Sequence, residues 1–226
     1  MVTLGRSPSH YLSRVLRTKP GEKVKVFNGV DGEYLGTILD IQKDSTTLAL
    51  DCKTSCVPKE ALKIHIAIAI TKGGRMDYSI QKSVELGVTE ISPLYSEFSE
   101  VHFKNNDRLD NKYRHWEKIV ISACEQSSRI SVPKVNKPVT FSEFTGRKFD
   151  ETCLLLDPSG EKNLFGLNPD NGFCLIIGPE GGFSPSEIAQ AEKNFRGVKL
   201  GPRILRSETA PIVAISILQA LHGDLS

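Results

Sequence analysis

The pattern of apolar and polar positions divides the chain into two parts with different periodicities. Between about residues 23 and 57 apolar and polar residues alternate, and the turn dipeptides Asn28-Gly29 and Asp31-Gly32 interrupt the alternation. Such a pattern predicts short strands joined by tight turns. We therefore expect a small barrel or sandwich, with strands at 23–27, 34–41 and 46–51.

A short amphipathic helix is predicted ahead of these strands. Ser7-Pro8 has the character of an N-cap followed by proline at the first helical position. The apolar face of the helix carries two flanking arginines: Tyr11, Leu12, Val15 and Leu16 form the apolar stripe, with Arg14 and Arg17 beside it.

After residue 62 the chain changes to alternating strands and helices. The strands are expected at 64–70, 91–95, 152–157, 173–177 and 198–200, and the helices at 77–86, 108–128, 185–195 and 210–222. The runs at 152–157 and 173–177 are almost continuously apolar, which is typical of strands in a buried parallel sheet. The alternation predicts a parallel α/β sheet with helices on both faces.

Composition places the chain among globular proteins. It has 226 residues, of which 39% are hydrophobic and 25% charged, enough apolar side chains to offset the entropy of ordering. It contains no apolar run of the roughly 20 residues that cross a bilayer and no apolar core of a signal peptide near Met1. We expect a cytoplasmic protein that does not contact a membrane. The five cysteines form no CxxC pair, which indicates reduced cysteines and no structural zinc.

The first loop with chemical character is Gly178-Pro179-Glu180-Gly181-Gly182-Phe183, which follows a predicted strand and leads into a helix. Glycines let backbone groups approach a ligand without a Cβ in the way, and parallel sheets bind ligands at the carboxyl ends of their strands. The spacing GxxGG is neither a P-loop nor the dinucleotide fingerprint GxGxxG. We interpret this segment as a ligand loop, the alternative being a tight strand–helix turn. Ser184 and Glu187 have the spacing of a capping box for the next helix.

The second loop, 200–211, also follows a predicted strand and opens a helix. Its charged residues Arg203, Arg206 and Glu208 stand between apolar segments, either as functional groups or as an internal Arg–Glu pair. Ser207 or Thr209 is expected to cap the helix that follows. That helix, 210–222, is apolar nearly all round, which predicts burial on both sides, including against a second subunit.

At these two loops the sequence resembles a known family. GPEGGF (178–183) followed by LGPRILRSETA (200–210) resembles the AdoMet-binding region of the knotted methyltransferases of the SPOUT class. It resembles specifically the bacterial family RsmE, which methylates N3 of a uridine in 16S ribosomal RNA. The resemblance continues through HYLSRVLR (10–17), QKSVELGV (81–88) and EQSSR (125–129). Ser128 departs from it, because glycine is common there.

The resemblance implies a PUA-like β-barrel RNA-binding domain at residues 1–65 and an α/β methyltransferase domain with a parallel sheet and a trefoil knot at residues 66–226. It implies AdoMet as methyl donor without a metal, a homodimer, and 16S ribosomal RNA within the 30S subunit as substrate. The AdoMet-binding residues are then expected to be Leu156, Gly178, Pro179, Glu180, Gly181, Gly182, Leu200, Gly201, Ile204, Leu205, Arg206, Thr209 and Ala210, with Asp157 beside Leu156.

Methylation of N3 of uridine requires removal of a proton and stabilisation of negative charge that spreads onto O2 and O4. We expect Arg206 to stabilise this charge and Glu208 or Glu125 to accept the proton. For Glu125 the alternative is an ordinary ion pair with Arg129, four residues further along a helix.

A basic cluster near the N-terminus is the expected RNA-binding site. The first 25 residues contain six lysines and arginines against one acidic residue, Glu22, and such a cluster attracts phosphates. We expect RNA contacts from His10, Arg14 and Arg17, the alternatives being a solvated face and, for His10, packing or capping. The segment 72–75 is either a further RNA contact or a plain turn.

Three other functions fit parts of the sequence. A non-catalytic RNA-binding or ribosome-assembly protein would use the basic N-terminal part alone, and AdoMet binding distinguishes it from an enzyme. A nucleotide-dependent oxidoreductase would need a GxGxxG turn, which is absent. The same fold acting on a different base or on ribose is separated from the first interpretation only by the resemblance to RsmE.

Overall fold

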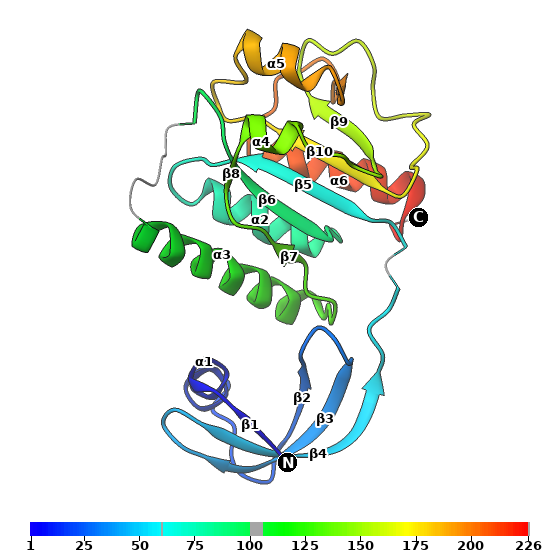
Figure 1. Ribbon diagram of the computed structural model, residues 1–226. Helices are drawn as coiled ribbons and strands as arrows, with labels where there is room; N and C mark the ends of the chain where they lie inside the picture. Colours follow the sequence, from blue (N-terminus) through cyan, green and yellow to red (C-terminus); the bar gives the residue numbers. More distant parts are fainter. Residues whose placement is uncertain (60, 100–105, 226) are drawn as a thin grey trace. The chain divides into compact units, whose positions relative to one another are not determined.

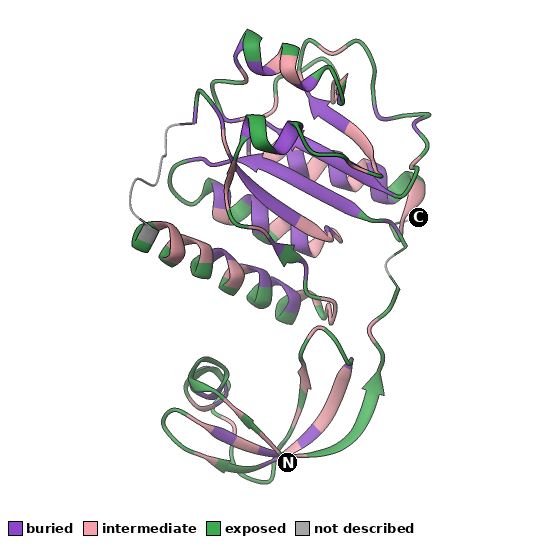
Figure 2. Cartoon of the chain, in the orientation of Figure 1, coloured by how far each residue is buried: buried purple, intermediate pink, exposed green. Residues whose placement is uncertain are grey.

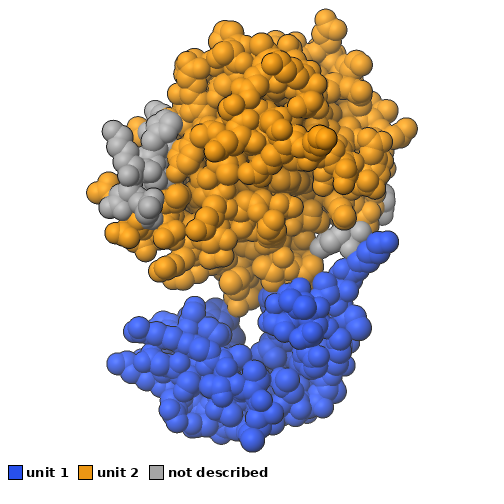
Figure 3. Space-filling view, viewed as in Figure 1, with its two compact units in different colours: residues 1–59 blue, residues 60–226 orange. Residues whose placement is uncertain are grey.

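The computed structural model describes residues 1–59, 61–99 and 106–225 (Figure 1). They form two compact units, Met1–Lys59 and Glu60–Ser226, which Figure 3 shows in separate colours. Strand β5 (Ile64–Ala69) lies wholly in the second unit. Each unit has a sheet of its own, as the change of periodicity along the sequence predicts.

The first unit contains a four-stranded antiparallel sheet. Its order is β1 (Val2–Leu4), β4 (Thr46–Ser55), β3 (Glu33–Ile41) and β2 (Lys23–Phe27). Ile38 on β3 pairs with Leu48 on β4, and both side chains are buried together with Leu12. β1 and β2 are the two edges of this sheet, so the strand pairing is that of a small antiparallel sheet, where we expected a small barrel or sandwich.

The helix of this unit begins earlier than Ser7. Helix α1 (Arg6–His10) has Gly5 as its N-cap, so the expected Ser7 cap is wrong, and the chain continues directly into a π-helical segment, η1 (Tyr11–Val15). Of the predicted apolar stripe, only Leu12 is buried. The other three side chains of that stripe are exposed: Tyr11, Val15 and Leu16.

The second unit is built on a parallel sheet. Its strands are β11 (Arg196–Val198), β9 (Thr152–Leu156), β10 (Phe173–Ile177), β5, β6 (Glu90–Tyr95) and β7 (Lys134–Val135), in that order, and β8 (Val139–Thr140) also pairs with β6. All residues of β5 and β10 are buried, and both strands are purple in Figure 2. The almost continuously apolar run at 173–177 is therefore a central strand covered on both faces, whereas the run at 152–157 forms β9, in which Leu154, Leu155 and Leu156 are buried and the first two residues are half-buried.

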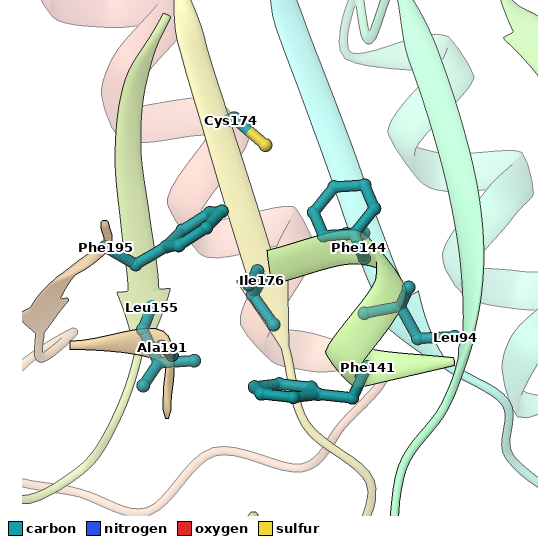
Figure 4. Packing of buried hydrophobic residues seen from close by; sticks show 9 residues of the cluster. Leu94, Phe141, Phe144, Leu155, Cys174, Ile176, Ala191 and Phe195 are labelled. Atoms are coloured by element: carbon teal, nitrogen blue, oxygen red, sulfur yellow. The ribbon is translucent and has the colours of Figure 1, made fainter. Parts of the chain in front are cut away.

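Helices cover both faces of this sheet. α2 (Arg75–Glu85) and α6 (Thr209–His222) lie behind it in Figure 1 and contact each other, and α3 (Asn106–Ser127) packs against α2. On the other face lie α4 (Phe141–Thr145) and α5 (Pro185–Ala191). Under these two helices Phe141, Phe144 and Phe195 pack on the strands around Ile176, as Figure 4 shows.

A glycine terminates helix α2. Gly87 has φ +88°, the Val88 N–H donates to the Ser83 carbonyl, and the Gly87 N–H donates to the Val84 carbonyl. These bonds form a Schellman motif, which needs a left-handed residue at this position. A Cβ on Gly87 would lie 2.3 Å from Nε2 of Gln219, so this glycine also permits the close approach of α6.

The predicted elements of the second unit are present with small shifts of their ends. Helix α5 ends at Ala191 and not at 195, and β11 ends at Val198, where we expected the strand to begin. The elements that the pattern did not reveal are two to five residues long, too short for a period to show: β1, β7, β8 and α4.

Candidate functional site

A pocket of about 420 Å³ opens at the carboxyl ends of β9, β10 and β11. Three loops form it, namely the segment after β9, the glycine-rich loop after β10, and the segment from the end of β11 to the start of α6. The volume is within the range of small-molecule sites, roughly 300–1,000 Å³. The position also agrees with the rule that parallel sheets bind ligands at this edge.

The loop after β10 is a tight turn that leads into a well-capped helix. The N–H of Gly182 donates to the carbonyl of Pro179, at 3.0 Å, and Gly182 has φ +71°, a conformation that favours glycine. Ser184 and Glu187 form both hydrogen bonds of a capping box at the start of α5. The predicted capping box is confirmed, and it fixes the end of the loop relative to the sheet.

Glu180 brings a carboxylate to the pocket. Burial by itself would raise the pKa of this carboxyl, but its own backbone N–H, the guanidinium of Arg75 and the hydroxyl of Ser207 together hold the pKa below its ordinary value. Arg75 donates from Nη1 to Oε1 of Glu180 and is the first residue of α2. The ion pair therefore ties the turn before α2, residues 72–75, to the loop after β10.

The loop after β11 presents two arginines and one buried hydroxyl. Arg203, Ile204 and Arg206 are exposed at the pocket, while Ser207 is buried and donates from Oγ to Oε2 of Glu208, at 3.2 Å. Helix α6 has Glu208 as its N-cap without a side-chain cap bond. The expected caps by Ser207 or Thr209 are therefore wrong, because backbone bonds to the Arg206 carbonyl close the first turn instead.

The structure brings most of the expected AdoMet-binding residues to one pocket. They are Leu156, Gly178, Pro179, Glu180, Gly182, Leu200, Gly201, Ile204, Leu205, Arg206 and Ala210, together with Asp157. Gly181 and Thr209 do not line it. The pocket is also lined by residues that were not among the expected AdoMet-binding residues: Pro158, Ile177, Phe183, Ile188, Val198, Arg203 and Ser207. Several of these are ordinary apolar side chains, which only the fold places at the pocket.

Two of the three expected catalytic residues lie together. Arg206 and Glu208 are on the same loop, with Nη1 of Arg206 4.0 Å from Oε1 of Glu208, and the Arg206 side chain is 80% exposed. Glu125 lies near the C-terminal end of α3 and does not line the pocket. Burial raises the pKa of its carboxyl. Arg129 donates to Ser131 and to the carbonyl of Val84 at the end of α2.

The expected RNA-binding residues belong to the first unit. His10, Arg14 and Arg17 are all exposed, on or directly after the segment formed by α1 and η1. Arg17 has φ +55° and ends this helical segment. Within unit 1 the three side chains therefore occupy one short stretch of surface, beside the exposed Tyr11 and Val15.

The described part of the chain contains neither a cluster of metal ligands nor a helix that could cross a membrane. In residues 1–59, 61–99 and 106–225, His, Cys, Asp and Glu side chains do not gather in threes as a metal site would need. Over the same residues, every helix is too short or too polar to cross a membrane.

Comparison with known proteins shows the family to which the chain belongs. Residues 58–219 match the family described as an RNA methyltransferase domain, and residues 7–51 match the RNA methyltransferase PUA domain. A methyltransferase from Legionella pneumophila, solved with bound SAM, superposes with a TM-score of 0.93 at 37% identity, over 99% of this chain and 93% of that one. The chain therefore belongs to the RNA methyltransferases with an N-terminal PUA domain.

Curated relatives narrow the family further. The ribosomal RNA small subunit methyltransferase E of Buchnera aphidicola (subsp. Schizaphis graminum) is 39% identical over 100% of this chain and 93% of its own length. The protein of that name from Neisseria gonorrhoeae, solved with S-adenosyl methionine, has a TM-score of 0.88 at 34% identity, over 100% of this chain and 93% of its own. This chain is a member of the ribosomal RNA small subunit methyltransferase E family, which confirms the resemblance seen in its motifs.

Proposed function

We propose that the protein transfers the methyl group of AdoMet to N3 of uridine 1498 in 16S ribosomal RNA. The observation that carries this proposal is the pocket itself. The two sequence motifs shared with the RsmE family form its walls, and relatives similar over the whole chain are named for small-subunit ribosomal RNA methylation or were solved with SAM.

The residues of the pocket suit AdoMet. Leu156, Ile177 and Val198 provide an apolar wall for a flat base. The carboxylate of Glu180, whose pKa lies below its ordinary value, suits a cationic ligand. Gly182 and Gly201 have φ +71° and +106°, and a Cβ on either would meet no atom within 4 Å, so their backbone lies open to a ligand.

The bound cofactor supplies a methyl group on a positively charged sulfur, so the reaction needs no metal. The side chains of the loop after β11 act on the uridine. Arg206 places a guanidinium where it stabilises the negative charge that develops on O2 and O4. Neither of the two glutamates lines the pocket. Glu208 is the proton acceptor for N3–H within one chain, because it lies beside Arg206, which does line the pocket, whereas Glu125 lies on α3.

The two units divide the work. Unit 1 positions RNA through His10, Arg14 and Arg17, and unit 2 binds AdoMet and performs the transfer. The exposure of the three basic side chains supports this division, as does the match of residues 7–51 to a PUA domain. The substrate on which they act is 16S ribosomal RNA within the 30S subunit, which places the protein in the cytoplasm.

The knot and the dimer belong to the same proposal. Strand β10 inserts between β5 and β9, and after β11, at the edge of the sheet, the chain returns to pack α6 against α2. This return path supports a trefoil knot through the loops of the pocket. Helix α6 buries Ala214, Ile215 and Leu218 within its own unit but leaves Leu221 41% exposed. One face of α6 is therefore buried within a single chain, and we propose that its remaining apolar surface packs against a second copy of the chain.

The activity is tested by incubating the protein with labelled AdoMet and 30S particles from cells that lack it, followed by nucleoside analysis. We expect label in N3-methyluridine, and at least about a hundredfold slower labelling with Arg206→Ala. Label in a different nucleoside would overturn the assignment of N3 of uridine. For the dimer, light scattering at low micromolar concentration should give twice the 24.9 kDa of one chain, and Leu221→Asp should give the single mass.

A further inference from the structure

The aromatic side chain of Phe98 is partly exposed and packs against the glycine-rich loop of the pocket. Phe98 follows β6 and is 45% exposed. Four of the residues Gly178–Gly182 line the pocket, but Gly181 turns instead to Phe98, since a Cβ on Gly181 would lie only 3.2 Å from the Cβ of Phe98. Phe98 therefore packs on the glycine-rich loop at a residue that does not face the pocket.

The backbone that carries this ring is firmly held. The N–H of Glu97 donates to Oε1 of Glu187, at 2.9 Å, and the other oxygen of Glu187 accepts from the N–H of Ser184 in the capping box of α5. Ser96 and Ser99 close the turn around Phe98, because the Ser99 N–H donates to the Ser96 carbonyl and the two hydroxyls are 2.9 Å apart.

A single exposed apolar side chain is ordinary on a protein surface. Phe98 differs because the turn that holds it is tied to the same capping box that ends the glycine-rich loop. Arg75, at the start of α2, binds Glu180 of this loop and keeps 46% of its side chain exposed. A fixed aromatic face of this kind is the feature that binds unpaired bases of RNA, because every base has a π-face.

We propose that Phe98 stacks on a base of the RNA substrate next to the site of methyl transfer. This inference rests on the proposed function and adds to it a binding residue for the substrate. A base must leave its stacked position before an enzyme can act on it, and an aromatic platform offsets the loss of stacking. The rigid backbone of residues 96–99 means that the platform is already in place before RNA binds.

The substitution that tests this is Phe98→Leu, compared with Phe98→Trp. Leucine keeps an apolar side chain against Gly181 but has no ring face, while tryptophan retains one. Loss of stacking on one base should raise KM for 30S particles roughly tenfold, with AdoMet affinity by calorimetry unchanged, and Phe98→Trp should remain near the unmodified protein. Phe165→Leu is the matched control, because Phe165 is also an exposed aromatic residue of unit 2, 64% exposed, and does not line the pocket.

A direct reading comes from the fluorescence of Phe98→Trp during titration with protein-free 16S ribosomal RNA. Stacking on a base should quench the new indole, while Trp116, which is fully buried, provides the background in the unmodified protein. An unchanged KM in Phe98→Leu, or a Phe98→Trp protein as impaired as Phe98→Leu, would overturn the proposal. If Phe98→Leu made the protein monomeric and left KM unchanged, the proposal would be overturned, and the ring of Phe98 would instead contact the second copy in the dimer. If the unmodified protein transferred no methyl group at all, the proposed function would fail. The quenching of indole fluorescence in Phe98→Trp would still show whether this side chain stacks on RNA.

Discussion

Arg75 and Glu180 are 105 residues apart in the chain and form an ion pair between the start of α2 and the glycine-rich loop. The pair links a turn that shows no clear function in the sequence to the wall of the pocket. It also helps to keep Glu180 ionised, because its other partners, Ser207 and its own backbone N–H, are neutral.

The Arg75→Ala variant should bind AdoMet more weakly at neutral pH by up to about fivefold, since a partly exposed ion pair contributes about 0.2–1 kcal/mol. The pKa of Glu180 is lowered in the folded protein, so its carboxylate stays ionised until the pH falls through that lowered value. Without Arg75 the pKa rises, and affinity should begin to fall at a higher pH. Calorimetry from pH 6 down to about 3.5, which spans the ordinary carboxyl pKa of 4.5, measures this, with Arg75→Lys, which keeps the charge, as the control. Identical pH profiles for Arg75→Ala and the unmodified protein would disprove the coupling.

Gly182→Val should weaken AdoMet binding at least tenfold. The left-handed conformation of Gly182 costs a residue with a Cβ about 1–2 kcal/mol, and the branched side chain would occupy space where backbone faces the ligand. Gly197→Val is a suitable control, because Gly197 lies on β11 at an open position without a positive φ. Calorimetry measures the AdoMet affinity of both variants, after circular dichroism has shown that they are folded. Equal affinities would show that Gly182 is not part of the binding site.

Arg206→Ala should lower single-turnover methylation by about a hundredfold or more, in the range found when one group that stabilises a developing anion is removed. RNA affinity should change little, because the interaction with the uridine is made mainly in the transition state. Arg203→Ala removes a comparable exposed charge from the same loop and should have a smaller effect. Full turnover in Arg206→Ala would pass the role to another residue.

Replacing Arg14 and Arg17 together by alanine should weaken RNA binding and flatten its dependence on salt concentration, because each phosphate contact releases counterions. AdoMet affinity should not change, since the pocket lies in unit 2. Lys23→Ala with Lys25→Ala removes the same charge from unit 1, but these lysines pair with Asp51 and Glu33. Equal salt slopes for the two double variants would assign the effect to net charge and not to a site.

Ser128→Gly should stabilise the protein by up to about 1 kcal/mol, the difference between left-handed strain and the entropy that glycine loses on folding. Ser128 has φ +59°, and the N–H of Arg129 donates to the carbonyl of Cys124, which is the bond of a Schellman motif after α3. This geometry explains why glycine is common at this position in the family. Urea unfolding of both proteins measures the difference, and a less stable Ser128→Gly protein would contradict it.

The sequence by itself determined the elements whose signal is local. The alternation around Lys23–Phe27, the apolar run at Phe173–Ile177 and the capping box at Ser184 each predicted an element that the structure contains. The same is true of the loops after β10 and β11, because glycine and charge at strand ends are visible in the residues themselves. Family resemblance then named the ligand, which the pattern alone left open.

The tertiary structure decided what depends on contacts between distant segments. It joined Arg75 to Glu180 and Phe98 to Gly181, and it brought Ile188 and Val198 to the pocket although they are ordinary apolar residues. It also set the caps of α1 and α6, because backbone carbonyls and glycine took the places that sequence assigned to Ser7, Ser207 and Thr209. Periodicity reports which face of an element is buried, whereas the partners on that face are fixed only when the strands assemble in the order β11-β9-β10-β5-β6-β7.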